Sequence, residues 1–338
     1  MNFAQPSASA LAVIKVIGQD VPSHIAGQLT ANGNVWIINP SGIAVSQSAQ
    51  VNVNGLIATT ADISNADILA GKTTFSGAPT GSSVTNAGSI TGGEGSVVLV
   101  APVVDNSGDI TAVGGDVALG AGSGFTVDYS GDGLTRFEVT PASGVSVTHT
   151  GNISAQGGAV YISAESSDAV QESVVSIGGS IEATRIEDRG GVIVISGGAR
   201  GVTEVSGDVI ADQAEGDGGE SIVTGELIDI EETANISANG AANGGSIQIG
   251  GAYQGAAIAS PVVRRASAPA DAPLPTAKRV LVRVGAQITA DAGAEGNGGT
   301  AIVWADENMF FYGAVSAKGG FIVGDGGLAE ISGKVALA

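Results

Sequence analysis

The stretch Gly151-Asn-Ile-Ser-Ala-Gln-Gly-Gly-Ala-Val-Tyr-Ile-Ser163 contains one copy of the pattern that decides the fold. Its first half alternates polar and apolar residues around Ile153, and a Gly-Gly pair separates it from a second half in which Val160 and Ile162 are two residues apart. A period of two is the side-chain period of a β-strand, and glycines between two such runs favour a turn. The stretch therefore predicts strand, turn and strand.

The same pattern recurs along most of the chain. Copies of the first half begin at Gly88, Gly108, Gly151, Gly179, Gly207, Ala234, Ala286 and Gly313. Those at 151, 179, 207 and 234 begin 28, 28 and 27 residues apart. A repeat of short strands and glycine turns with this period predicts a solenoid. Because no helix separates the copies, each coil must pair with the next at the strand spacing of about 4.8 Å, which predicts an all-β, single-stranded parallel β-helix.

The composition supports this architecture and excludes several functions. The chain has 338 residues, 54 of them Gly, and 43% hydrophobic residues but only 4% aromatic ones, so its core must be built from Val, Ile, Leu and Ala. Outward Ser, Thr, Asn, Gln and Glu are then expected to face water. A net charge of −20 disfavours nucleic acid as a partner, and the lack of Cys excludes disulfides, Cys-zinc sites and thiol catalysis. No apolar run is long enough to predict a membrane-spanning helix.

One early stretch is more distinctive than the repeats. Asn34-Val-Trp-Ile-Ile38 is an apolar run typical of a buried strand, and Asn39-Pro-Ser-Gly42 then predicts a tight turn. Pro favours the second position of such a turn, Asn can bond to its own backbone, and Gly tolerates an unusual φ. Period-two alternation resumes at Ile43 and Val45.

This stretch also carries a family resemblance. Together with Leu29-Thr-Ala-Asn-Gly33 and Ala49-Gln-Val-Asn-Val-Asn-Gly-Leu-Ile-Ala58, it resembles the N-terminal secretion domain of filamentous-haemagglutinin-type exoproteins of two-partner secretion systems. The usual family motif is Asn-Pro-Asn-Gly-Ile, so Ser41 departs from it at the third position. The resemblance and the crossover rule imply a right-handed helix. It further implies recognition by a cognate outer-membrane β-barrel transporter, for which the candidate residues are Asn39, Pro40, Ser41, Gly42 and Ile43.

The family implies a protein secreted to the bacterial surface, where it acts as an adhesin or haemagglutinin-like protein toward a host or bacterial receptor or glycan. Trp304-Ala-Asp306 and Gly326-Gly-Leu-Ala-Glu-Ile-Ser-Gly-Lys334 resemble the repeats of large haemagglutinin-type adhesins. Residues 1–6 lack the basic start and apolar core of a signal peptide, and residues 2–10 resemble an internal part of the secretion domain. An export signal and a first coil are therefore expected upstream.

The pattern divides the chain into five segments. Residues 1–122 are predicted to form a secretion-domain-like β-helix that is incomplete at its N-terminus, and residues 123–150 an extra-helical hairpin segment. Residues 151–251 and 280–338 are β-helix repeats, the second set open at its C-terminus. Between them, residues 252–279 contain four prolines and no repeat, and are predicted to be a Pro/Ala/Arg loop insertion.

Two further segments have the composition of a binding site. Arg264, Arg265, Lys278 and Arg279 form a basic group that fits either a solvated loop or a contact site for a sulfated glycan or acidic polymer. Asp128-Tyr-Ser-Gly-Asp-Gly133 resembles the opening of a calcium loop, but Val139 stands where the bidentate Glu belongs, which favours a polar turn.

Catalysis is the main alternative, because parallel β-helices include polysaccharide lyases and hydrolases. Such enzymes need clustered carboxylates, whereas the acidic residues here are mostly single or adjacent in sequence, and adjacent residues point to opposite faces of a strand. His24 and His149 are the only imidazoles. We therefore predict no enzyme activity, catalytic residue, cofactor or metal site. A stalk that presents a C-terminal toxin is a second alternative.

Overall fold

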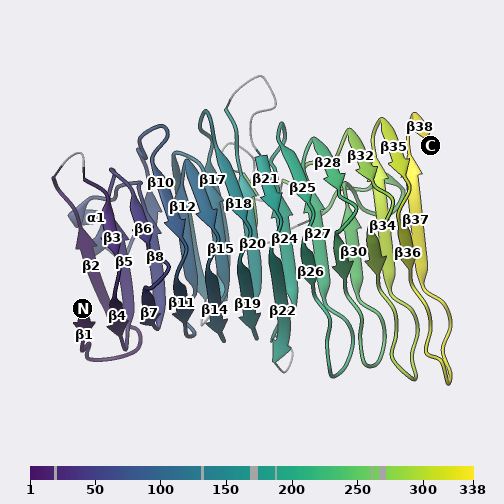
Figure 1. Cartoon of the computed structure of the whole chain (residues 1–338), viewed down its shortest axis with the longest axis horizontal. Helices are drawn as coiled ribbons and strands as arrows, with labels where there is room; N and C mark the ends of the chain where they lie inside the picture. The colour runs from purple at the N-terminus through teal and green to yellow at the C-terminus, as the bar shows by residue number, and fades with distance from the viewer. Residues whose placement is uncertain (19–20, 131–132, 168–173, 187–188, 260–261, 266–271) are drawn as a thin grey trace.

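The computed structural model of the chain is a parallel β-helix, which confirms the fold predicted from the repeats (Figure 1). It describes all residues except 19–20, 131–132, 168–173, 187–188, 260–261 and 266–271. The coils stack in chain order along the long axis, and each contributes one strand to each of three parallel sheets.

The strands of the three sheets follow one another in sequence order. Sheet A contains β1 (Asn2–Phe3), β4 (Gln28–Ala31), β7 (Gln50–Val53), β11 (Ser89–Gly92), β14 (Asp109–Val113), β19 (Asn152–Gln156), β22 (Ser180–Ile186), β26 (Asp208–Ile210), β29 (Asn235–Ser237), β33 (Gln287–Thr289) and β36 (Ala314–Ser316), with β23 (Arg189–Gly190) folded back on β22. Sheet B contains β2 (Leu11–Lys15), β5 (Asn34–Ile38), β8 (Gly55–Thr59), β12 (Val97–Ala101), β15 (Val117–Ala121), β20 (Ala159–Ala164), β24 (Val192–Ser196), β27 (Glu220–Thr224), β30 (Ser246–Ile249), β34 (Thr300–Ala305) and β37 (Leu328–Gly333). Sheet C contains β3 (Ser23–Ile25), β6 (Ile43–Val45), β10 (Ser83–Asn86), β13 (Val103–Asn106), β18 (Ser146–His149), β21 (Val174–Ile177), β25 (Val202–Val205), β28 (Leu227–Ile230), β32 (Arg279–Val282), β35 (Asn308–Phe311) and β38 (Ala336–Leu337).

The register explains why the repeat has its particular sequence. Ile153, the centre of its first half, pairs with Ile110 in the preceding coil and with Ile181 in the next, and all three side chains are buried inside the helix. The glycine that opens the repeat lies at the corner between sheets C and A. A Cβ at Gly151 would collide with the carbonyl oxygen of Gly108 one coil away, and the same holds at the next coil. These copies therefore need glycine there for close approach of two backbones, whereas the copies at 234 and 286 open with Ala.

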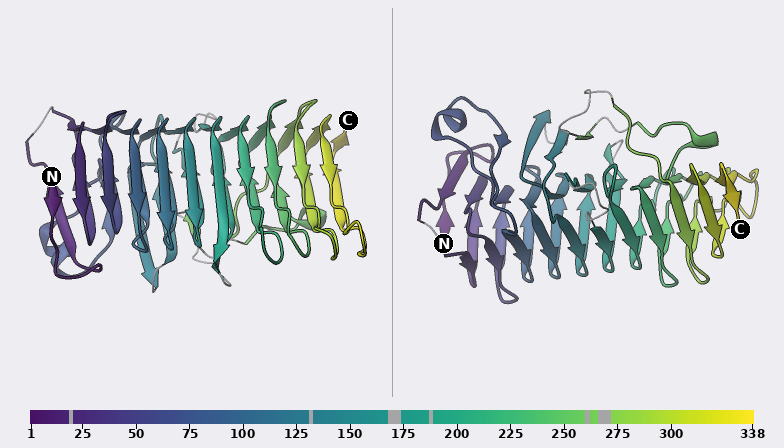
Figure 2. Two further views of the ribbon diagram at one scale, coloured as in Figure 1. Left: turned by 60° about the horizontal axis from the view of Figure 1, so that its bottom comes forward. Right: turned by 90° about the horizontal axis from the view of Figure 1, so that it is seen from above.

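A small extra-helical sheet, called here the cover sheet, lies across the outer face of sheet B (Figure 2). Its strands, in spatial order, are β31 (Val263–Arg265), β17 (Gly133–Thr140), β16 (Gly124–Ser130) and β9 (Thr74–Phe75). β16 pairs antiparallel with β17 and with β9, whereas β31 pairs parallel with β17. Short helices, α1 (Asn65–Leu69) and η1 (Tyr253–Gly255), lie in the segments that lead to this sheet. Three excursions that are distant in sequence thus meet on one face.

The cover sheet creates a second hydrophobic core. Outward side chains of sheet B, including Ile57, Val98 and Val194, are buried in one hydrophobic cluster with Phe125 and Phe137 of the hairpin. The expectation that outward residues are polar and face water is therefore wrong for the covered part of sheet B. Its strands are buried on both faces, and such strands are continuously apolar instead of alternating.

The structure also changes the interpretation of two segments. The described part of 252–279 is more than a surface loop, because Val263 is buried in β31 and Ile258 forms a bridge with Leu274. Their apolar side chains are buried in the second core, which compensates for ordering a Pro-rich segment. The segment 123–150 likewise ends differently, since residues 146–149 form β18 and belong to the stacked coils.

A buried polar ladder crosses three coils of sheet C. The Nδ2 of Asn86 donates to the Oδ1 of Asn106 at 2.7 Å, and the Nδ2 of Asn106 lies 3.0 Å from the Nδ1 of His149. The Nε2 of His149 lies 3.0 Å from the carbonyl oxygen of Ser180, and the side chains of the three ladder residues are buried. Since an amide N–H must donate to Nδ1 and a carbonyl must accept from Nε2, the arrangement requires neutral His149 with its proton on Nε2.

This ladder makes the stability of the fold sensitive to acid. Burial lowers the pKa of His149 below its ordinary value of 6.5. The unfolded chain then binds a proton more readily than the folded one, so the stabilisation is complete above pH 6.5 and is lost as the pH falls below it toward the folded-state pKa. We expect the free energy of unfolding, measured by urea titration, to fall between pH 7 and pH 5. His149→Asn would extend the asparagine ladder and remove the titrating group, so an unchanged acid dependence in this variant would contradict the assignment.

Candidate recognition site at the Asn39–Ile43 turn

The turn connects β5 of sheet B with β6 of sheet C near the N-terminal end of the stack. The Oδ1 of Asn39 accepts from the backbone N–H of Ser41 at 2.9 Å, and the carbonyl oxygen of Asn39 accepts from the N–H of Gly42 at 3.0 Å. Side chain and backbone therefore close the same turn, as the Asn-Pro-Ser-Gly order predicts.

Asn39 also joins neighbouring coils. Its fully buried side chain donates through Nδ2 to the carbonyl oxygen of Val21 at 3.0 Å and to the Oγ of Ser23 at 2.9 Å, both in the preceding coil. Its backbone N–H donates to the carbonyl oxygen of Thr59 in the next coil at 3.0 Å. One asparagine thus fixes the corner of three successive coils, and a residue without an amide could not replace it.

Gly42 and Ile43 complete the buried part of the turn. Gly42 has φ of +116°, which favours glycine, and a Cβ there would lie 3.3 Å from the carbonyl oxygen of Ser83. Ile43 points into the core and pairs with Ser23 on one side and Val84 on the other. These two residues hold the turn in place and offer little surface to a partner.

Pro40 and Ser41 are different, because they remain half-buried and line a shallow hollow of about 560 Å³. Its other lining residues are mostly apolar: Val16, Ile17, Gly18, Pro22 and Pro79. Ile17 is 90% exposed. The five predicted residues therefore divide into a buried group, Asn39, Gly42 and Ile43, and an accessible pair, Pro40 and Ser41.

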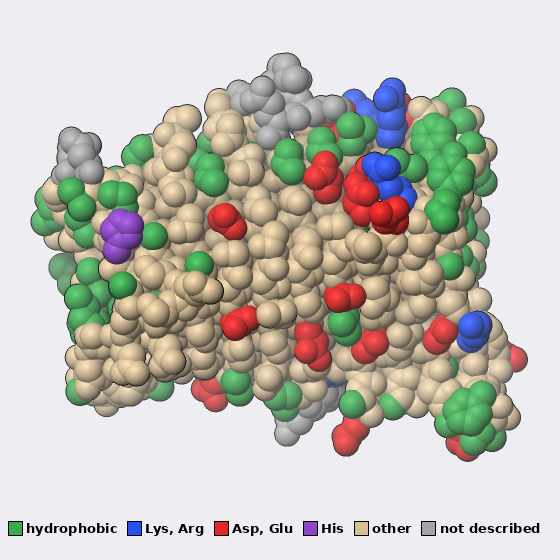
Figure 3. All heavy atoms as spheres, in the orientation of Figure 1, with side chains coloured by type: hydrophobic (Ala, Val, Ile, Leu, Met, Phe, Trp, Pro, Cys, Tyr) green, Lys and Arg blue, Asp and Glu red, His purple; other side chains and the backbone are tan. Residues whose placement is uncertain are grey.

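The predicted basic site lies far along the stack from this turn, and its cations have acidic neighbours. The Nζ of Lys278 is 2.6 Å from the Oε1 of Glu226, and the Nε of Arg279 is 3.7 Å from the Oε2 of Glu307. Figure 3 shows basic and acidic side chains side by side in this region. Arg264 belongs to β31 with Arg265, but their side chains lie outside the described part of the chain.

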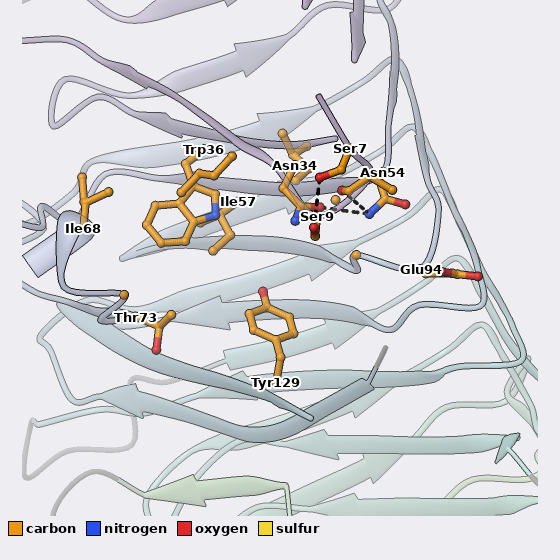
Figure 4. Close-up of a pocket in the computed structure, with 16 residues that line it drawn as sticks. Ser7, Ser9, Asn34, Trp36, Asn54, Ile57, Ile68, Thr73, Glu94 and Tyr129 are labelled. Carbon is orange, nitrogen blue, oxygen red and sulfur yellow. Dashed lines mark hydrogen bonds between the residues drawn. The ribbon is translucent and has the colours of Figure 1, made fainter. Parts of the chain in front are cut away.

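A second hollow, a groove of about 620 Å³, lies on the outer face of the first coils and was not predicted from the sequence (Figure 4). Trp36 and Ile57 lie in it, with Leu11, Ile68 and Tyr129 at its sides. Trp36 could have pointed to it, because a large aromatic residue occupies a strand position that faces outward.

The described residues contain no group of three or more His, Cys, Asp or Glu side chains that could hold a metal ion. Asp128, from the calcium-like stretch, forms an ion pair with Arg136 at 3.5 Å, and Asp132 lies outside the described residues. Within the described chain, neither α1 nor η1 has the length and apolarity needed to cross a bilayer.

Comparison with known proteins gives three results. The family model described as the TPS secretion domain, where TPS denotes two-partner secretion, matches residues 1–211. The crystal structure of the HMW1 secretion domain from Haemophilus influenzae superposes with a TM-score of 0.79 at 27% sequence identity, over 99% of this chain and 86% of that one.

Curated relatives match over a shorter range. A heme/hemopexin-binding protein of Haemophilus influenzae is 48% identical over 63 residues, and its counterpart in strain Rd is 46% identical over 63 residues. Each alignment covers 19% of this chain but only 7% of the relative, so this chain matches a small part of those proteins.

Proposed function

Because the chain belongs to the family of TPS secretion domains, we propose that it directs the export of a surface exoprotein through one cognate outer-membrane β-barrel transporter. The family implies such a transporter, and proteins of this type are secreted across the outer membrane to the cell surface. The observation that carries the proposal is the match to the family model over the first 211 residues.

We further propose that the Asn39–Ile43 turn contributes to recognition. The geometry supports this role, because the buried group fixes the corner of three coils while Pro40 and Ser41 face an apolar hollow. A rigid, partly apolar surface loses little conformational entropy when a partner binds. Asn39, Gly42 and Ile43 would act by positioning the accessible pair.

The architecture also suits export followed by folding outside the cell. Each coil is hydrogen-bonded mainly to the coils beside it, so a coil that has folded offers an edge on which the next can form. The chain has no Cys, so disulfides cannot lock it before passage through a pore. We propose that the coils joined by Asn39 provide the first such edge.

At the surface, an adhesin or haemagglutinin-like role, including haemagglutinin-type repeats after the secretion domain, is our proposal for the protein of which this domain is part. Its receptor would be a host or bacterial surface protein or glycan. Haem binding, suggested by the name of the curated relatives, is not part of this proposal: His149 is buried and bonded within the polar ladder, and His24 is exposed but belongs to no cluster of metal-ligating side chains among the described residues. We propose no enzymatic role.

The proposal can be tested by expressing the chain behind a cleavable signal peptide, with and without an outer-membrane β-barrel transporter of the two-partner secretion type from the same organism. Full-length chain should reach the medium or the cell surface only with the transporter, and should remain in the periplasm without it. Equal amounts outside the cell in both strains would contradict the proposal. A transporter that lacks its periplasmic domains serves as the matched control and should not restore export.

A further inference from the structure

The cover sheet does not extend over the first coil, where the outward side chains of Leu11 and Val13 are apolar. The cover ends at β9, whereas the outward side chains of β2 lie beyond it, where Leu11 is 40% exposed and Val13 is 37% exposed. Val13 pairs in register with Trp36, which is only half-buried. The row of outward apolar residues that is covered farther along the stack therefore continues here without a cover.

The groove occupies this position (Figure 4). The half-buried Trp36 forms its floor beside the buried Ile57, while Thr73 and Tyr129 border it on the side of the cover sheet. The ring of Trp36 is fixed by an edge contact with Phe75, at 5.2 Å between ring centroids and 63° between planes. The floor of the groove is therefore preorganised, since its conformation does not depend on a bound partner.

The far end of the groove is polar. The Nδ2 of Asn54 donates to the Oδ1 of Asn34 at 3.1 Å and to the carbonyl oxygen of Ala8 at 3.1 Å. This pair occupies the space that Cβ atoms of Gly55 and Gly95 would need. Glu94 borders this end and is the single charged residue that lines the groove within the described chain.

The spacing of residues along the groove and the charge at its polar end indicate which ligand the groove fits. Asn34 and Trp36 lie on the same face of β5, about 7 Å apart along the strand, which is the distance between alternate residues of an extended chain. An extended segment that lies along β5, with apolar side chains over Ile68 and Trp36, would thus carry a later residue of the same face toward Glu94. A cation is favoured there by Glu94 and by the net charge of −20.

We propose that this groove binds an extended segment of another protein that presents two apolar side chains and a lysine or arginine on one face. A second copy of this chain is a poorer occupant, because it is strongly acidic and its Lys278 and Arg283 are paired with Glu226 and Asp229. The segment would extend the cover by one element and bury the exposed row. This binding is independent of export.

The test uses synthetic peptides and the fluorescence of Trp36 in the folded chain. Trp304→Phe leaves Trp36 as the one tryptophan, since the chain has two. The probe is Thr-Leu-Thr-Leu-Thr-Lys-Thr, with matched peptides in which Glu replaces Lys or Ser replaces both Leu. We expect saturable quenching or a blue shift with the first peptide, and binding weaker by about tenfold or more with each control. Titration calorimetry provides a readout that does not depend on the fluorophore.

Two variants locate the binding in the groove. Glu94→Gln should lower the affinity for the lysine peptide about tenfold, to a value close to that for the Glu peptide. Leu11→Ser should lower the affinity for every peptide that carries the two leucines. Glu182→Gln, an exposed carboxylate on the outer face of sheet A, is the control and should change nothing. Three outcomes would overturn the proposal. The first is the absence of any saturable fluorescence change or heat of binding up to about 1 mM peptide, and the second is equal affinity for the Lys and Glu peptides. The third is a shift of Trp36 emission that depends on protein concentration alone, which would indicate that a second copy occupies the groove.

Discussion

Replacing Asn39 with alanine is expected to lower the free energy of unfolding by about 2–4 kcal/mol and to reduce export strongly. The substitution removes the side-chain hydrogen bonds to Val21, Ser23 and Ser41, and leaves buried backbone and hydroxyl groups without those partners. The first quantity is measured by urea unfolding of the purified chain. The second is measured as the fraction of full-length chain outside the cell when the transporter is present.

Variants of the accessible pair, Pro40 and Ser41, distinguish a role of the turn in recognition from a role in folding. Pro40→Ala and Ser41→Ala leave the bonds from Asn39 to the preceding coil in place, so each should change the free energy of unfolding by less than about 1 kcal/mol. If the turn is recognised, the double variant should still lose export. Normal export of the double variant, combined with poor export of Asn39→Ala, would mean that the turn acts through folding alone.

Phe125→Ala is expected to detach the cover sheet from sheet B and to lower the free energy of unfolding by about 3–5 kcal/mol. The ring of Phe125 is fully buried and stacks on Phe75 at 4.5 Å between centroids and 2° between planes, and Phe75 in turn supports Trp36. Loss of the ring would leave a cavity between the hairpin and sheet B. Limited proteolysis should then cut within residues 123–145, and the emission of Trp36 should shift to the red.

Thr126→Ala is the matched control on the same strand. Its hydroxyl contacts that of Thr74 at 3.1 Å on the exposed side of the cover, so its loss should cost less than about 1 kcal/mol. Far-UV circular dichroism should remain close to wild type in both variants, because the stacked coils keep their own core. Equal unfolding midpoints for the two variants would show that the second core contributes little.

The repeat predicted the coils because its information is local. A glycine or alanine at the corner, an isoleucine or valine in the core and a Gly-Gly turn recur, 27 or 28 residues apart over much of the chain, and the coils share the same steric rules. The cover sheet could not be predicted in this way. Val263 pairs with Phe137, more than a hundred residues earlier, and nothing in the Pro-rich sequence around it specifies that partner. The continuous apolar run Val192-Ile-Val-Ile195 was predicted only as one more strand of the repeat, although such a run is typical of a strand buried on both faces.

The candidate site likewise has one part that its local sequence predicts and another part that depends on contacts between distant residues. The turn at Asn39 follows from its own residues, whereas its bonds to Val21 and Thr59 depend on the stacking of coils. His149 was identified only as one of two isolated imidazoles, because its partner Asn106 is 43 residues away. The groove combines residues from the N-terminal loop, four coils, the α1 segment and the hairpin. It was therefore not predicted, and Trp36 was assigned only to an apolar run typical of a buried strand.

The cover sheet has a consequence for how the molecule responds to force. A stack in which each coil bonds only to its neighbours would come apart one coil at a time when its ends are pulled. β9, β16, β17 and β31 instead tie coils from residue 75 to residue 263 into one block. Under load from one end, the coils outside this span should unravel in small steps, and those beneath it should resist until the cover ruptures in a single larger event. A domain at a bacterial surface would then unfold under force in two stages, first coil by coil and then, at higher force, as one block.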